Sequence, residues 1–463
     1  MRVVKSTFSH THFGVMFALL WMLAEIGMLL SSPATVAASV PHDIQVLYDR
    51  KQYQQALDEI AKLDQDAAAS AEIRRVKIRS LLKLGNPKDA LLIYDQLVAG
   101  LKQEDEPLLH DVALGFIVVL MKDMREQMRG AAYTALKEIT SDEVIPYFED
   151  GLSDGSGPVR VLAVEGLARS EAGRKSLKLR TALEDQAAVV KARAVKAIGQ
   201  SGDPSVIPLI ETATKDEMAT VRIAAYGALI RLGRKDAWDR LRNTAEAPNP
   251  EDRADTLRVI ADLKDQRGVP LMTELLSYKQ PSVRGAAARA LGHLGRKDVR
   301  AQIEALLKDP VQAVREAAAA SLADLGGKES VPVLAKALND GAFTVRASAV
   351  AALLQLGEPF RLVAPTVLAL AQQNDTAARS SAAYALGKAT KPNAGDAAAL
   401  LESLTADPLP GPKIVALRSL GRIGNRDSIP LFKEALHDTN EAVRATAGGG
   451  ILHLLDGKKP DRS

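Results

Sequence analysis

The 463-residue chain contains no cysteine and few aromatic residues. Without cysteine it can form no disulfide, use no thiolate nucleophile and bind no zinc through sulfur. Aromatic residues make up 4% of the sequence, too few to suggest a surface that stacks nucleic-acid bases. The formal net charge of +3 is also far from the dense positive charge of a nucleic-acid-binding protein. The 47% of hydrophobic residues instead favours helix packing rich in alanine and leucine.

What the chain does contain is a 31-residue repeat marked by a basic residue, which we call the anchor. The eleven anchors are Arg129, Arg160, Lys191, Arg222, Arg253, Arg284, Arg315, Arg346, Arg379, Lys413 and Arg444. Small insertions precede Arg379 and Lys413, and Arg444 completes the series. Leu or Ile stands seven residues after every anchor, and Ala stands three residues after ten of them. These offsets share one face of an α-helix, whereas a strand would need a period of two. The repeat therefore predicts a helix at each anchor, buried along its small and apolar face.

A second helix is expected before each anchor. Proline stands fourteen residues before six of the anchors, at Pro146, Pro208, Pro270, Pro332, Pro365 and Pro430. Proline suits the first turn of a helix, where its missing N–H group has no helical partner to lose. Two short helices cannot enclose a core by themselves, so neighbouring units must stack and share one continuous core.

An aspartate lies six residues before eight of the anchors, at Asp123, Asp154, Asp185, Asp216, Asp309, Asp340, Asp407 and Asp438. Such an acid can pair with a base within one unit or between stacked units, and it can accept N–H groups at the start of the second helix. On this basis Asp309→Ala should leave Arg315 short of a partner. The exceptions are Ala247, Tyr278 and Gln373.

The Pro, the Asp and the Val-Arg pair at these offsets resemble HEAT repeats, in particular the phycobilisome-lyase-like variety, over residues 107–457. The resemblance implies an all-α, right-handed solenoid of about eleven helix pairs. It also implies that the Asp and the anchors form a structural ladder, so these carboxylates are not expected to be catalytic.

Residues 39–106 follow a different repeat length. The segment Tyr53 to Leu57 is echoed by Pro87 to Leu91, with the alanines of the two segments 34 residues apart. Helix pairs of this length with an Ala-Leu element resemble tetratricopeptide repeats, and we expect two such pairs. They either bind a peptide or cap the N-terminal end of the solenoid.

Residues 1–38 have the features of an export signal: basic residues, an apolar run at residues 13–30 and small residues at the end. The run is long enough to stay in the membrane as an anchor, although Glu25 interrupts it. We expect the protein to be exported, with its repeats in the periplasm, and to be attached to the inner membrane only if this segment is not cleaved.

At the other end of the chain, three consecutive glycines, Gly448, Gly449 and Gly450, interrupt the last helix. Each glycine costs a helix about 1 kcal/mol relative to alanine. We therefore expect the last unit to fray and residues 458–463 to be disordered.

We find no phosphate-binding loop, nucleophile elbow or metal signature. HEAT-like iron enzymes such as deoxyhypusine hydroxylase carry His-Glu pairs on successive repeats, and no His of this chain precedes a Glu. His293 and His453 are five units apart, too far to share a metal. Bilin lyases share the repeat type, but no pigment-site motif is recognisable. We therefore expect no catalytic residue, metal or cofactor. The alternative function is a HEAT-like enzyme or chromophore lyase.

The remaining candidate site is the helix face opposite the core, one, five and nine residues after the anchor. In HEAT-like solenoids this face lines the concave side, as the resemblance implies. Its long basic residues are Arg169, Lys196, Arg231, Arg258, Arg289, Lys388, Arg418 and Arg422, against Glu138, Glu165, Asp262 and Asp324. Lys196, Arg231, Arg258 and Arg289 come from four consecutive units and should form one stripe. A solvated face without a ligand is the other interpretation.

The sequence thus predicts an exported, non-catalytic scaffold. Its concave stripe would bind an acidic patch on a protein partner, with no nucleic acid involved. A membrane would be involved only if residues 1–38 stay attached, which would make the protein an anchored envelope-assembly factor.

Overall fold

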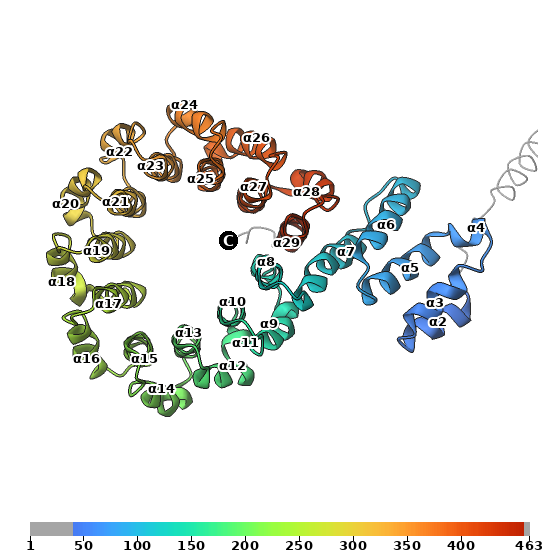
Figure 1. Cartoon of the computed structure of the whole chain (residues 1–463), viewed down its shortest axis with the longest axis horizontal. Helices are drawn as coiled ribbons and strands as arrows, with labels where there is room; N and C mark the ends of the chain where they lie inside the picture. The colour runs from blue at the N-terminus through green and yellow to red at the C-terminus, as the bar shows by residue number, and fades with distance from the viewer. Residues whose placement is uncertain (1–39, 458–463) are drawn as a thin grey trace, which may run out of the picture.

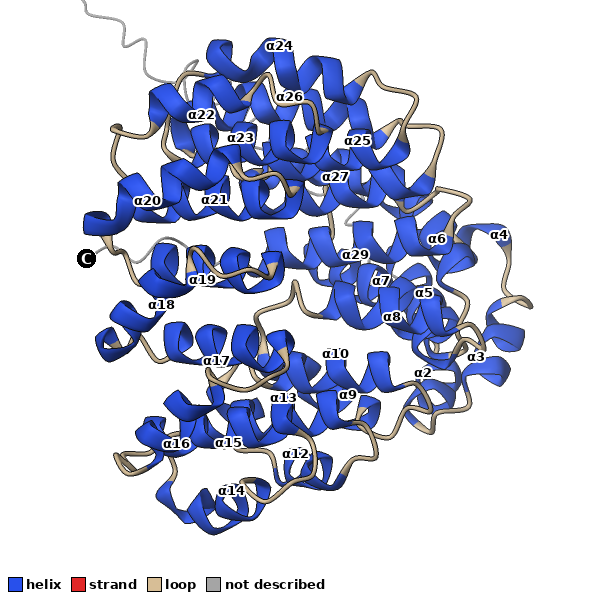
Figure 2. Ribbon diagram, turned by 60° about the vertical axis from the view of Figure 1, so that its left-hand side comes forward, coloured by secondary structure: helices blue, strands red, loops and turns tan. Residues whose placement is uncertain are grey.

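The computed structural model describes residues 40–457, and this part of the chain consists of helices and loops without a strand (Figure 2). The predictions for residues 1–38 and 458–463 lie outside the described residues. Most of the helices form two concentric layers around an open centre (Figure 1). The inner layer contains α8 (Glu126–Leu136), α10 (Gly157–Leu167), α13 (Ala188–Gly199), α15 (Ala219–Arg231), α17 (Pro250–Asp262), α19 (Pro281–His293), α21 (Gln312–Leu325), α23 (Phe343–Gln355), α25 (Thr376–Leu386), α27 (Pro410–Ile423) and α29 (Glu441–Asp456).

The outer helices alternate with these along the chain, and short 3₁₀ turns flank several of them. They are α7 (Glu106–Val118), α9 (Ile145–Gly151), α11 (Glu171–Arg174), α12 (Leu177–Thr181), α14 (Ile207–Ala213), α16 (Ala237–Thr244), α18 (Val269–Leu275), α20 (Arg300–Ala305), α22 (Val331–Ala337), α24 (Phe360–Ala371), α26 (Ala394–Thr405) and α28 (Ile429–Ala435). The predicted helical solenoid is therefore confirmed. All eleven anchors are the fourth residue of an inner helix.

The N-terminal helices extend away from this double layer (Figure 1). They are α2 (His42–Asp49), α3 (Tyr53–Ile60), α4 (Gln65–Ala68), α5 (Ala71–Lys83) and α6 (Pro87–Leu101). Both echoed segments begin a helix, one at Tyr53 and the other at Pro87. Their identity as tetratricopeptide repeats stays a prediction. A small core that includes Ile44, Ile60 and Ile73 lies apart from the main core, which is continuous from α5 to α29.

Five of the six prolines at the predicted helix starts do lie in the first turn of an outer helix. Pro365 is the exception, because it lies inside α24. That helix begins earlier, at Phe360, whose N–H donates to Asn393 Oδ1 at 3.0 Å. Asn393 is buried and its Nδ2 donates to the carbonyl of Glu358 at 2.8 Å. The insertion around Asn393 thus holds an extended α24 in place, and the prediction for Pro365 was wrong.

The ladder joins neighbouring units. Each paired anchor reaches the aspartate of the following unit, in the pairs Arg129–Asp154, Arg160–Asp185, Lys191–Asp216, Arg284–Asp309, Arg315–Asp340, Arg379–Asp407 and Lys413–Asp438. Within a unit the anchor instead binds the backbone of its aspartate, as Arg315 Nη1 does to Asp309 O at 2.8 Å. The aspartate side chain also accepts an N–H at the start of the inner helix, as Asp309 Oδ1 does from Val311 at 2.9 Å.

The predicted pairing between stacked units is therefore confirmed, and two other parts of the ladder prediction are corrected. The side-chain pairs in this series join units and do not form within them, because the anchor points toward the next unit. Arg315 pairs with Asp340 at 2.8 Å, so removal of the Asp309 side chain leaves Arg284 without its partner, not Arg315.

The two ends of the repeat array meet, and the array closes into a ring. The last helix, α29, packs against α7 and α8 at the start of the array (Figure 1). A Cβ at Gly448 would stand 2.6 Å from the carbonyl oxygen of Ala113, and one at Gly449 would stand 3.0 Å from that of Ala135. The glycines are buried and let the helices approach closely. The expected fraying of the last unit was wrong, since helix propensity says nothing about this distant contact.

Polar contacts surround the closing seam, which we define as the contact of residues 426–456 with residues 104–138. Lys433 pairs with Glu104 at 2.5 Å, and Arg426 pairs with Glu106 at 2.8 Å. His453 Nδ1 lies 2.9 Å from the carbonyl oxygen of Glu138. The seam therefore combines close backbone packing with ion pairs between residues more than 300 positions apart.

Candidate binding groove on the inner face

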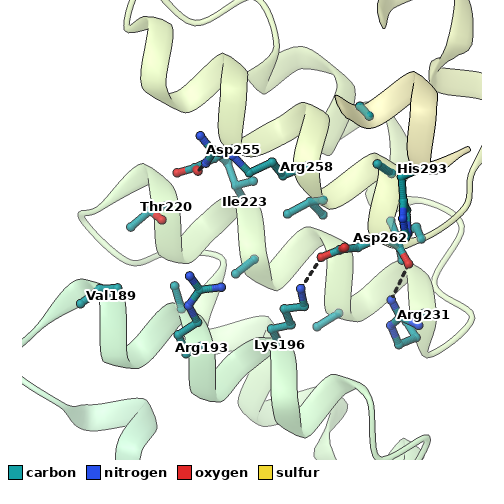
Figure 3. A pocket seen from close by; sticks show the side chains of 18 of the residues that line it. Val189, Arg193, Lys196, Thr220, Ile223, Arg231, Asp255, Arg258, Asp262 and His293 are labelled. Atoms are coloured by element: carbon teal, nitrogen blue, oxygen red, sulfur yellow. Dashed lines mark hydrogen bonds and ion pairs between the residues drawn. The ribbon is translucent and has the colours of Figure 1, made fainter. Parts of the chain in front are cut away.

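The four predicted binding residues line one cavity of about 530 Å³ between α13, α15, α17 and α19. Lys196 comes from α13, Arg231 from α15, Arg258 from α17 and Arg289 from α19. Figure 3 shows the first three of these side chains around the hollow. We call this cavity the groove. The structure thus brings together all four residues of the predicted stripe.

Small residues of α15 lie beneath the hollow, and the side chain of Val259 from α17 packs onto one of them, Gly227. Five residues after the anchor, α13, α17 and α19 carry Lys196, Arg258 and Arg289, whereas α15 carries Gly227. The long side chains therefore stand on either side of a helix that presents almost no side chain at this position. Apolar residues form the floor: Ala192, Ile223, Ala224, Ala228, Val259, Ala261, Leu263 and Ala290. The result is an apolar floor with a basic rim.

Ion pairs hold some of the rim cations. Lys196 pairs with Asp262, and Arg231 Nη2 donates to the backbone carbonyl of Asp262 at 3.0 Å. Arg258 pairs with Asp255, one turn earlier on the same helix. Arg289 is exposed and makes no hydrogen bond or ion pair to any residue in the described part of the chain.

The groove is basic relative to the rest of the protein. Its lining includes five cationic side chains, the fifth being Arg193, against the two carboxylates of Asp255 and Asp262. The difference of three positive charges equals the formal net charge of the whole chain. The residues outside the groove therefore sum to a formal charge near zero, whereas the groove lining is basic.

Three of the groove residues were not predicted to be part of the binding site, because only some helix positions were considered and histidines were treated only as metal ligands. Arg193 and Asp255 lie two residues after their anchors, and His293 lies nine after its anchor but was considered only as a metal ligand. Positions two and nine are seven residues apart, which is close to two helical turns. The helical period could therefore have placed Arg193 and Asp255 on the concave face.

Other residues predicted for this face lie elsewhere on the ring. Lys388 and Arg422 lie over the ring of Tyr384, with their charged groups 5.4 and 5.9 Å from its centre. Arg418 comes within 4.0 Å of Glu138 at the seam, and burial lowers the pKa of its guanidinium. The basic face is thus divided, and only one part of it lines the groove.

Within residues 40–457, no three His, Asp or Glu side chains gather as a metal ion would require. No helix in the same range combines the length and hydrophobicity needed to cross a bilayer. What the groove can do chemically is hold an anionic group against its rim and an apolar group against its floor.

A family model described as HEAT repeats matches residues 176–254, 238–323, 281–354, 299–387 and 397–450, together more than half of the chain. A search of curated proteins found no match.

Several solved structures are similar. Human deoxyhypusine hydroxylase in complex with glycerol is 21% identical over 61% of this chain and 97% of its own, with a TM-score of 0.32. The complex of CpcE and CpcF of phycocyanin lyase from Nostoc sp. is 21% identical over 60% and 94%, with a TM-score of 0.28. Karyopherin Kap95p, in a structure with RanGDP, is 12% identical over 89% and 64%, with a TM-score of 0.36. These are likenesses of fold alone.

Proposed function

The chain belongs to the HEAT-repeat family, and from this premise we propose that it is an exported, non-catalytic scaffold that binds a protein partner in the groove. HEAT arrays present extended concave surfaces, and such surfaces are suited to binding other proteins. The partner contributes an acidic segment, because the groove carries an excess of three positive charges among its lining residues. Nucleic acid is not the expected ligand.

The observation that carries this proposal is the convergence of cations from four helices over an apolar floor. Lys196, Arg231, Arg258 and Arg289 are far apart in the sequence, yet they line one cavity. Arg258 is 57% exposed, and the one ion pair that it makes among the described residues lies within its own helix, so it stays available to a ligand. Like charges arranged in this way attract an acidic segment and increase its rate of encounter.

The size of the groove defines what can enter it. A cavity of about 530 Å³ accepts a few side chains but not a folded domain. The partner therefore inserts a segment in which an apolar side chain reaches the floor while neighbouring carboxylates meet the rim. Because the rim is exposed to solvent, the affinity should fall as the salt concentration rises.

A direct titration tests the proposal. The probe is a fluorescein-labelled peptide of alternating glutamate and leucine, and a peptide of glutamine and leucine serves as its uncharged counterpart. Fluorescence anisotropy should show binding of the glutamate peptide, weakening with salt, and little binding of the glutamine peptide. Reversal of charge in an Arg258→Glu and Arg289→Glu double variant should reduce the affinity at least tenfold.

A matched control reverses two cations outside the groove. Lys235 lies just before the outer helix α16, and Arg242 lies within it. Both are exposed, and neither makes a side-chain hydrogen bond or ion pair within the described residues. Lys235→Glu with Arg242→Glu changes the net charge equally and should leave the affinity within about twofold. If both double variants lose the same affinity, the effect is one of net charge and the groove is not the site.

The second part of the proposal is export. It rests on residues 1–38, with their basic start, apolar run and small residues. Intact-mass measurement of the protein recovered from the periplasm should give a chain shortened by this segment. A full-length mass in the membrane fraction would instead show an anchored protein, and a full-length mass in the cytoplasm would contradict export.

A further inference from the structure

The groove lies where the ladder is interrupted at two successive junctions between units. Ala247 stands where Arg222 would find its aspartate, so no ladder ion pair joins α15 to α17. At the next junction Tyr278 replaces the aspartate, and the guanidinium of Arg253 stacks on its ring with 4.8 Å to the centre. Beneath the groove, ladder carboxylates therefore join α13 to α15, through Lys191 and Asp216, but not α15 to α17 or α17 to α19.

One ion pair crosses the groove instead. Lys196 on α13 reaches past α15 to the carboxylate of Asp262, the last residue of α17 (Figure 3). Arg231 on α15 donates to the backbone carbonyl of the same aspartate at 3.0 Å. Asp262 therefore holds cations from two other helices. Lys196 and Asp262 are each 39% exposed, so the pair is open to competition from solvent.

We propose that Asp262 is the residue that sets the specificity of the groove for carboxylates. Its side chain occupies the position beside Lys196 that a carboxylate of the ligand takes, and a bound acidic segment displaces it. This inference rests on the proposed function, since it concerns the same groove and an acidic peptide segment as its ligand.

The physical reason is an exchange of one ion pair for another. An exposed ion pair contributes little to stability, so its rupture costs little if a second carboxylate replaces the first. A peptide without an anionic group offers no such replacement and must leave Lys196 solvated or leave the pair across the groove in place. Only a ligand that carries a carboxylate can therefore make this exchange, and a neutral apolar segment gains only its contact with the floor.

Asp255 provides a contrast within the same groove. It pairs with Arg258 from the same helix, one turn away, and so does not cross the hollow. A change of Asp255 removes one negative charge from the groove lining without removing a bridge between helices. A comparison of variants at the two aspartates therefore distinguishes a general effect of groove charge on affinity from the displacement of a carboxylate at Lys196.

The test compares Asp262→Asn with Asp255→Asn, using the labelled glutamate–leucine peptide and its glutamine counterpart. Asp262→Asn should raise the affinity for the glutamate peptide three- to tenfold, and Asp255→Asn should raise it less than twofold. The Asp262 variant is expected to fold, because a carboxylate at the C-terminal end of a helix is unfavourable to the helix dipole. Circular dichroism would verify the helical content.

A double-mutant cycle with Lys196 decides between displacement and simple charge. In a Lys196→Met background the gain from Asp262→Asn should disappear, since the cation that Asp262 pairs with is no longer there for a ligand carboxylate to bind. An equal gain with and without Lys196, or an equal gain from both aspartates, would overturn the inference while leaving the proposed function intact. Failure of the glutamate peptide to bind the wild-type protein or either aspartate variant would refute both.

Discussion

Removal of one ladder carboxylate should weaken the whole ring measurably. Asp309 is the sharpest case, because its side chain is 5% exposed and that of its partner Arg284 is 14% exposed. Arg284 Nε and Nη2 donate to the two carboxylate oxygens at 2.8 and 2.9 Å. The backbone N–H of Val311 donates to one of them at 2.9 Å. Asp309→Ala removes all three interactions at once.

The expected cost of Asp309→Ala follows from what is left behind. A hydrogen bond to a charged group contributes about 1.5–3 kcal/mol, and an unpaired buried charge costs more. Arg284 retains its bonds to two backbone carbonyls and some access to water, which limits the loss. We therefore expect a decrease of about 2–3 kcal/mol in the free energy of unfolding. Asp309→Asn should cost less, since its amide oxygen can still accept from Val311.

Urea denaturation followed by far-UV circular dichroism measures this decrease. The control is Asp239→Ala on the outer helix α16, because Asp239 is exposed and makes no side-chain hydrogen bond or ion pair within the described residues. The control should change the stability by less than about 0.5 kcal/mol. Equal shifts of the urea midpoint for Asp309→Ala and Asp239→Ala would refute the conclusion that the ladder stabilises the ring.

Three further predictions concern pH, the seam and bound metal. Hydrogen bonds from Arg315 lower the pKa of Asp340, although burial opposes this shift. The contribution of Asp340 to the free energy of unfolding should therefore be complete above about pH 4 and should decline as the pH falls further. Urea midpoints measured across this pH range check the prediction. Gly448→Ala forces a Cβ against the carbonyl of Ala113, so it should open the ring. Small-angle X-ray scattering should then show a larger radius of gyration. Gly395→Ala should leave the radius of gyration unchanged, because a Cβ at this position meets open space. The purified mature protein should contain no stoichiometric metal and no chromophore; about one equivalent of iron or zinc by elemental analysis, or a visible absorption band, would contradict this.

The local repeat could be predicted from the sequence because each anchor marks the first turn of a new inner helix. The period of the small and apolar residues specifies the buried face, and all eleven anchors occupy the same place in their helices. The same argument brought Lys196, Arg231, Arg258 and Arg289 to one side of four stacked helices. Stacking is a contact between neighbours, so a repeating sequence carries the information that it needs.

Ring closure could not be predicted in this way. It depends on the summed curvature of all the units, and the sequence gives no measure of the small rotation at each step. The glycines at 448–450 therefore looked like a weakness of one helix, although they allow α29 to approach α7 and α8. The bridge from Lys196 to Asp262 escaped prediction for a related reason, since it joins units that are not adjacent.

The central claim is that a partner inserts an acidic segment into the groove, and site-specific photo-crosslinking tests it most directly. A photoreactive residue replaces Thr220 in the groove, Arg242 on the outer layer or Tyr53 in the N-terminal helices, in cells with an intact envelope. We predict an adduct at position 220 that maps to an acidic segment of one partner and is lost when Arg258 and Arg289 are changed to glutamate. An adduct at position 53 or 242 without one at position 220, or one at position 220 that survives the charge reversal, would contradict the account.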